Sequence, residues 1–92
     1  MDPVRLRRYR NLRRRILYKG QYRLQGTEEY KGLSAEFLAF SGGISDQTAR
    51  KIIVMYYRDV RSLVWISYAL HYSESQIKRL KNAAITFKKS GF

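Results

Sequence analysis

Apolar residues recur at the spacing of α-helices along almost the whole of this 92-residue chain. The clearest segment runs from Val4 to about Leu17, after an Asp2-Pro3 pair of the kind that starts a helix. Its apolar stripe comprises Leu6, Tyr9, Leu12, Ile16 and Leu17. No segment alternates like a strand, and the chain has no Asn-Gly or Asp-Gly hairpin signal. The sequence therefore predicts an all-α fold, a small bundle of about four to five helices.

Glycine and polar residues interrupt the helical pattern after this first segment. Residues 18–32 contain Gly20, Gly26 and a polar run, and we interpret them as a loop. A short helix is then expected over residues 35–40, with Ser34 as its N-cap and a pair of glycines as its stop.

The middle of the chain predicts a central helix. Residues 47–58 are apolar on nearly every side, and either Ser45 or Asp46 is placed to cap their start. The expected organisation is a basic N-terminal helix and loop over residues 1–32, followed by a helical domain over residues 33–92.

Residues 63–89 predict a helix-turn-helix at the end of the bundle. A helix of about eight residues, 63–70, is followed by three turn residues, 71–73, and then by a long amphipathic helix over residues 74–89. Two helices joined by so short a turn must cross steeply, which is the geometry of this motif.

The outer face of the last predicted helix has the chemistry of a DNA-reading surface. Opposite its apolar side lie cationic, amide and hydroxyl side chains with no acid among them, namely Ser75, Lys78, Arg79, Asn82, Thr86 and Lys89. Arg and Lys donate to guanine in the major groove, Asn pairs with adenine, and Ser and Thr donate to phosphates or bases. We therefore expect this face to bind DNA.

The net charge of +12 is concentrated at the two ends of the chain. Residues 1–23 hold nine basic residues against one acid, and residues 74–92 hold five against one. Residues 24–73 between them hold five of each sign. Two basic ends around a neutral body favour an anionic partner: nucleic acid first, and an acidic protein or anionic lipid second.

Composition also excludes several classes of site. The chain has no cysteine and one histidine, so thiolate metal sites, Cys nucleophiles and multi-His zinc sites are ruled out and general-base chemistry is disfavoured. We expect no enzyme activity, no metal and no cofactor. No apolar run approaches the roughly 18 residues of a membrane span, so we expect no membrane partner and a cytoplasmic location.

The arginine-rich first helix is open to three interpretations. It could contact the DNA backbone, with Arg7, Arg8, Arg14 and Arg15 as the candidate residues. It could pack its apolar stripe on the body while the arginines are only solvated. It could form a homodimer, since bacterial helix-turn-helix proteins often read paired half-sites.

Four short stretches carry a resemblance to a known family: Tyr56-Tyr57-Arg58, Ser62-Leu63-Val64-Trp65-Ile66, His71-Tyr72-Ser73 and Ala84-Ile85. In order, they resemble the Arg-Tyr-like helix end, the Trp-x-x-Ile-Ala-like helix, the Gly-Tyr-Ser-like turn and the end of the recognition helix in sigma-factor region 4. The chain is most similar to small phage-encoded transcriptional regulators of that type. The turn departs from the family pattern at His71, where Gly is usual.

This resemblance implies a sequence-specific protein that binds double-stranded DNA and regulates transcription for a phage or mobile element in a bacterial host. Host RNA polymerase is a further partner that it implies. It places recognition on Ser75, Gln76, Lys78, Arg79 and Asn82, with Ser73 as the N-cap and a phosphate contact.

Two other functions stay open on the sequence alone. One is a DNA-binding accessory factor of the excisionase or packaging type, which would act without touching RNA polymerase. The other is a basic interaction protein that captures an acidic host protein. Trp65 is expected to pack in the core or between elements and not to serve as a stacking platform.

Overall fold

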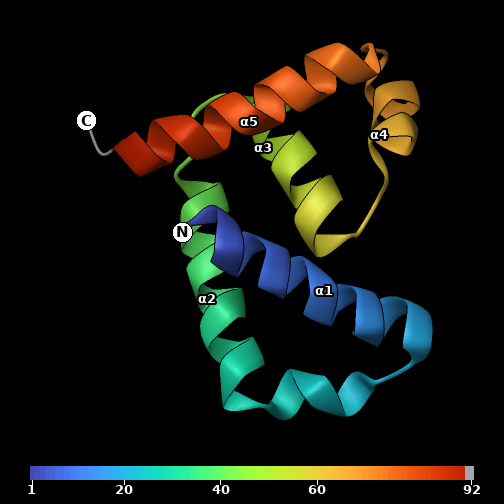
Figure 1. Cartoon of the computed structure of the whole chain (residues 1–92), viewed down its shortest axis with the longest axis vertical. Helices are drawn as coiled ribbons and strands as arrows, with labels where there is room; N and C mark the ends of the chain where they lie inside the picture. Colours follow the sequence, from blue (N-terminus) through green and yellow to red (C-terminus); the bar gives the residue numbers. More distant parts are fainter. Residues whose placement is uncertain (91–92) are drawn as a thin grey trace.

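Residues 1–90 form five α-helices and two short helical segments in this computed structural model (Figure 1). The structure describes the backbone of residues 1–90 and the side chains of residues 1–86. In chain order the elements are α1 (Pro3–Lys19), the 3₁₀ segment η1 (Tyr22–Gly26), α2 (Glu28–Gly42), α3 (Gln47–Ile53), the π-helical segment η2 (Val54–Arg58), α4 (Leu63–Leu70) and α5 (Glu74–Ser90). No strand occurs among residues 1–90, so the predicted all-α class is confirmed.

α1 forms where its start signal and apolar stripe predict it. The Asp2 side chain accepts a hydrogen bond from the backbone N–H of Arg5 at 2.9 Å, and the helix ends at Gly20, whose φ of 64° suits glycine. Four of the five predicted stripe residues are buried, but Leu17 is 41% exposed. Leu17 follows the buried Ile16 directly, and adjacent residues lie about 100° apart around a helix.

The predicted loop over residues 18–32 is wrong over much of its length. It contains η1, and α2 begins at Glu28, not after Ser34. The Thr27 side chain caps α2 by accepting from the Tyr30 N–H at 3.2 Å, and two acids in the first turn favour the helix N-terminus. Gly32 suggests a break in the sequence, but it lies exposed inside α2, where the packing of buried neighbours outweighs its low helix propensity.

Two arginines of α1 stabilise the end of the central helix. Asp46 caps α3, which continues into η2 without a break, so the helix predicted over residues 47–58 has a π-helical last part. Arg10 donates to the Tyr56 carbonyl at 2.9 Å, and Arg13 donates to the Arg58 carbonyl at 2.8 Å. These bonds satisfy carbonyls at a helix C-terminus, which have no partner within the helix itself.

The buried side chains form two clusters. The larger one joins α1 and α2 to the central helix, through Leu6, Tyr9, Leu12, Ile16, Tyr30, Leu33, Phe37, Phe40, Ile44, Ala49, Ile53, Tyr57 and Ile85. The smaller one lies between the central helix, α4 and α5, around Ile52, Ile66 and Ile77. The larger cluster takes residues from both 1–32 and 33–92, and the expected boundary between those ranges falls inside α2.

α4 and α5 are joined by a three-residue connection, as the sequence predicts. His71 ends α4 with a φ of 61°, the left-handed conformation for which glycine is usual. Ser73 and Gln76 form a reciprocal cap on α5: the Gln76 N–H donates to the Ser73 hydroxyl at 3.2 Å, and the Ser73 N–H donates to the Gln76 amide oxygen at 3.1 Å. The identity of this pair as a DNA-binding helix-turn-helix stays a prediction.

Candidate nucleic-acid interface

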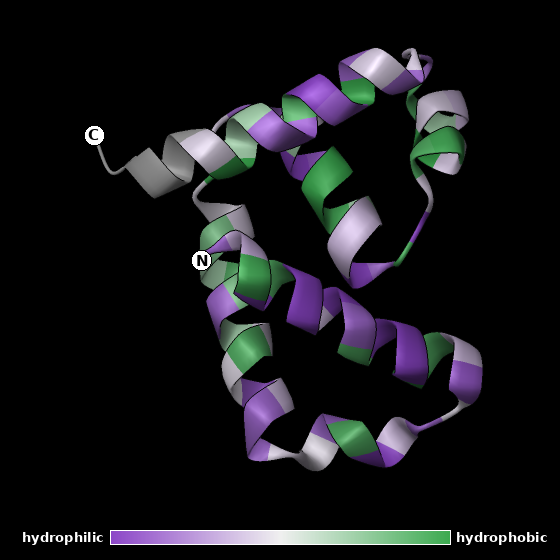
Figure 2. Cartoon of the chain, in the orientation of Figure 1, coloured by the Kyte–Doolittle hydropathy of each residue, from purple (hydrophilic) through white to green (hydrophobic). Residues whose placement is uncertain are grey.

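The outward face of α5 carries most of the residues that the sequence assigns to DNA binding. Ile77 and Ile85 are buried on the inward side of the helix. The predicted residues Ser75, Lys78, Arg79, Asn82 and Thr86 are all exposed. In Figure 2 hydrophilic and hydrophobic residues alternate along α5, as they do in an amphipathic helix. Neither Lys78 nor Arg79 forms an ion pair with any residue among 1–86.

Two of the residues predicted to contact DNA, Ser73 and Gln76, cap the N-terminus of α5. The Ser73 hydroxyl and the Gln76 amide oxygen are both used in the cap, although both residues remain exposed. The Gln76 side chain also lines a hollow of about 270 Å³ with Arg79 and with Asp46 at the start of α3. Lys89 lies outside the residues whose side chains are described.

A groove of about 630 Å³ separates α5 from the N-terminal half of α1. Its lining residues are Pro3, Arg7, Arg10, Asn11, Tyr56, Tyr57, Lys81, Asn82, Ile85 and Thr86. Three of them are cations and none is an acid, so the groove concentrates positive charge beside the outward face of α5. A concave surface lined by one sign of charge attracts ligands of the opposite sign.

Lys81 is one of the three cations of this groove, and it is not among the residues predicted from the sequence to bind DNA. Its Nζ lies 4.9 Å from the centre of the Tyr56 ring, and the Arg10 guanidinium lies over the same ring at 4.1 Å. Burial lowers the pKa of Lys81, and the nearby charges of Lys78 and Arg10 lower it further. Lys81 is three residues before the apolar Ala84 on the inward side, so the helical repeat suggests that Lys81 packs against the core. Only the position of the neighbouring α1 shows that Lys81 also lines the groove.

The four α1 arginines proposed as backbone contacts lie in different surroundings. Arg7 lines the groove beside α5, whereas Arg14 lines a separate cleft against the start of α4. Arg8 forms an ion pair with Glu29, and Arg15 donates to the Gln21 side chain at 2.9 Å. The structure therefore brings Arg7 close to α5 and gives Arg8 and Arg15 partners within the chain.

The described part of the chain contains neither a cluster of metal ligands nor a membrane-spanning helix. Among residues 1–86, no three His, Asp or Glu side chains lie close enough together to hold a metal ion. None of the helices described is both long and apolar enough to cross a bilayer. Comparison with protein-family models, with curated proteins and with solved structures gives no match for this chain.

Proposed function

We propose that this protein binds double-stranded DNA by placing α5 in the major groove. The observation that carries the proposal is the exposed face of α5, where Lys78, Arg79 and Asn82 lie with no acid among them. The major groove admits an α-helix, and these three side chains supply the donors and acceptors that pair with guanine and adenine edges. The face therefore combines the correct shape with the correct chemistry.

The groove between α1 and α5 supports the same proposal through the DNA backbone. When a helix lies in the major groove, its edges face the phosphates on either side. Arg7 and Lys81 lie in the protein groove between α1 and α5, beside the reading helix, and have no acidic partner among residues 1–86. Contacts of this kind add affinity without base preference and fix the register of the reading helix.

The biological role that we propose is transcriptional regulation for a phage or mobile element. It rests on the resemblance of residues 49–85 to sigma-factor region 4, which also makes host RNA polymerase a proposed partner. An accessory factor that marks or bends DNA would use the same surface. A promoter placed beside a binding site selected from random sequences separates the two, because a regulator changes transcript levels and an accessory factor does not.

Salt dependence of duplex binding is the direct test of the proposal. We expect log K for a labelled duplex, followed by fluorescence anisotropy, to fall steeply with log salt, at about 0.9 per phosphate neutralised. Lys78→Ala should lower the affinity, whereas Lys51→Ala, an exposed lysine of α3, serves as the matched control. The absence of binding to any duplex at low salt would contradict the proposal.

A further inference from the structure

α4 leaves three of its large apolar side chains exposed. Of its eight residues only Ile66 is buried, while Val64, Trp65 and Tyr68 are 47%, 42% and 78% exposed. The sequence predicts that Trp65 packs in the core or between elements, but much of its side chain is exposed. Single apolar residues are common on protein surfaces, but several neighbours on one short helix mark an interaction surface.

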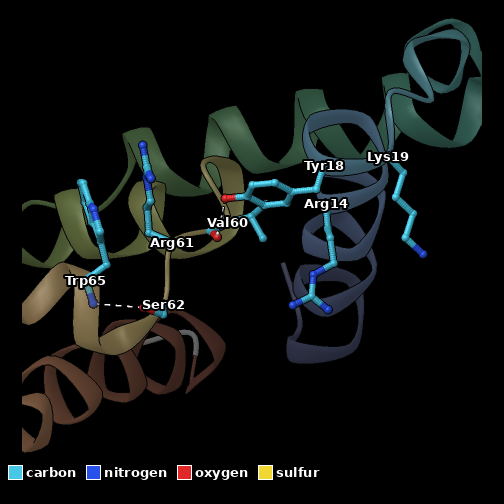
Figure 3. Close-up of a pocket in the computed structure, with 7 residues that line it drawn as sticks. All are labelled: Arg14, Tyr18, Lys19, Val60, Arg61, Ser62 and Trp65. Carbon is cyan, nitrogen blue, oxygen red and sulfur yellow. Dashed lines mark hydrogen bonds between the residues drawn. The ribbon is translucent and has the colours of Figure 1, made fainter.

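A cleft of about 620 Å³ continues this surface toward the end of α1 (Figure 3). Its lining residues are Arg14, Tyr18, Lys19, Val60, Arg61, Ser62 and Trp65. Figure 3 shows Tyr18 reaching from α1 toward Val60, with Arg61 and Trp65 side by side beyond it. The Tyr18 hydroxyl donates to the Val60 carbonyl at 3.4 Å. This hydrogen bond links the end of α1, which forms one wall of the cleft, to the segment before α4.

One residue that lines the cleft, Val60, has an unusual backbone conformation. Val60 has a φ of 55°, although a β-branched side chain strongly disfavours the left-handed region. Its side chain is buried, and this packing holds the strained residue in place. The next residue is Arg61, whose guanidinium carbon lies over the Trp65 ring at 4.3 Å.

Positive charge surrounds the apolar walls. Arg14, Lys19 and Arg61 line the cleft, and no lining residue is an acid. None of the three forms an ion pair with another residue among 1–86. Exposed Trp, Tyr and Arg are also the residues that dominate binding energy at protein interfaces. A ligand that fits this cleft combines negative charge with an apolar group.

We propose that the α1–α4 cleft binds an acidic segment of a partner protein. A bulky apolar side chain of that segment inserts between Tyr18 and Trp65, and its carboxylates face Arg14, Lys19 and Arg61. Charge complementarity of this kind guides association and excludes partners of the same sign. A second copy of this chain fits the cleft less well, because each copy carries a net charge of +12.

Two other anionic occupants fit the cleft less well. Single-stranded nucleic acid stacks its successive bases on free aromatic faces, but Arg61 covers one face of Trp65. An anionic membrane binds the apolar and basic faces of one amphipathic helix, whereas the residues of this site come from two helices and the segment before α4. No residue of α5 lines the cleft, so this binding does not depend on the proposed DNA-binding face.

The emission of Trp65, the only tryptophan in the chain, reports on the cleft directly. The probe is a synthetic, Trp-free helical peptide with Leu and Phe on one face and Glu on the other. We expect it to shift the Trp65 emission to shorter wavelength in a saturable way. A matched peptide with Gln in place of every Glu should bind at least about ten-fold more weakly.

Variants of the cleft separate specific from general attraction. Tyr18→Ser and Arg61→Ala should each weaken the acidic peptide by about ten-fold or more. Lys51→Ala, which replaces an exposed lysine of α3 outside the cleft, should leave the affinity for the acidic peptide unchanged. Circular dichroism verifies that each variant stays folded.

Three results would overturn the proposal: equal binding of the Gln peptide, no effect of Tyr18→Ser, or a Trp65 shift given only by oligo-dT or by anionic vesicles. Failure of duplex binding with retained peptide binding would instead overturn the proposed DNA function alone. The two proposals can therefore fail separately.

Discussion

The basic residues of α1 and those of α5 look alike in the sequence but differ in what they are available to do. In α1, Arg10 and Arg13 are half-buried and bonded to backbone carbonyls, while Arg5 and Arg8 are paired with Glu36 and Glu29. In α5, Lys78 and Arg79 have no ion pair within residues 1–86 and lie exposed. The difference teaches that a count of positive charges overstates the surface available to a polyanion.

Replacing neighbouring arginines of α1 gives the largest expected contrast. Arg13→Ala removes the bonds of a half-buried guanidinium to the Arg58 carbonyl and the Tyr30 hydroxyl, and should destabilise the protein by about 2–3 kcal/mol. Arg14→Ala removes an exposed side chain and should change stability by less than about 0.5 kcal/mol. Urea unfolding followed by circular dichroism measures both. Equal losses would contradict the division between structural and available arginines.

DNA binding should show a second contrast, between base reading and backbone contact. Arg79→Ala should weaken the preferred duplex by about 1–3 kcal/mol and relax its base preference. Arg7→Ala should weaken preferred and random duplexes alike, because the proposed docking of α5 brings Arg7, which lines the groove beside α5, close to the phosphates. Competition between the two duplexes measures the ratio. If both variants acted equally on both duplexes, the assignment of α5 as the reading helix would be wrong.

The alkaline limit of stability tests the packing between α1 and the central helix. Burial raises the pKa of Tyr57 to about 12, above its ordinary value of 10.0, so folding favours the neutral phenol. Stability should be complete below about pH 10 and fall by about 1–2 kcal/mol as the pH rises toward 12. Tyr57→Phe should show a smaller loss over the same range in urea unfolding. An identical loss in the variant would rule out Tyr57 as its source.

The smallest expected effect concerns Lys81, which lines the groove between α1 and α5. Burial and two neighbouring charges lower the pKa of Lys81, so its charged form costs stability below that pKa and the cost disappears as the lysine loses its proton at higher pH. At neutral pH, Lys81→Met should therefore stabilise the free protein slightly, by about 0.5 kcal/mol or less. The same variant should weaken all duplexes and reduce the salt slope by about 1. Loss of stability without loss of DNA binding would assign Lys81 a purely structural role.

Local signals made parts of the fold predictable. Asp2-Pro3 marks the start of α1, and the ranges of α4 and of its three-residue connection to α5 follow from short-range periodicity. The start of α2 was missed because Gly32 suggests a break, whereas Thr27 and the burial of Tyr30, Leu33 and Phe37 extend the helix through it. The exposed face of α5 was predictable for the same reason as α1: both depend on the helical repeat alone.

The sequence by itself determined α1, α4 and α5, the faces that α1 and α5 expose and the excess of positive charge, because caps and periodicity act over a few residues. Only the tertiary structure decided which cations are available. Arg10 and Tyr56, and Arg13 and Arg58, meet across about 45 residues of chain. The walls of the α1–α5 groove and of the α1–α4 cleft are also far apart in the sequence. No local pattern encodes such partners, since they depend on how the buried faces of separate helices pack together.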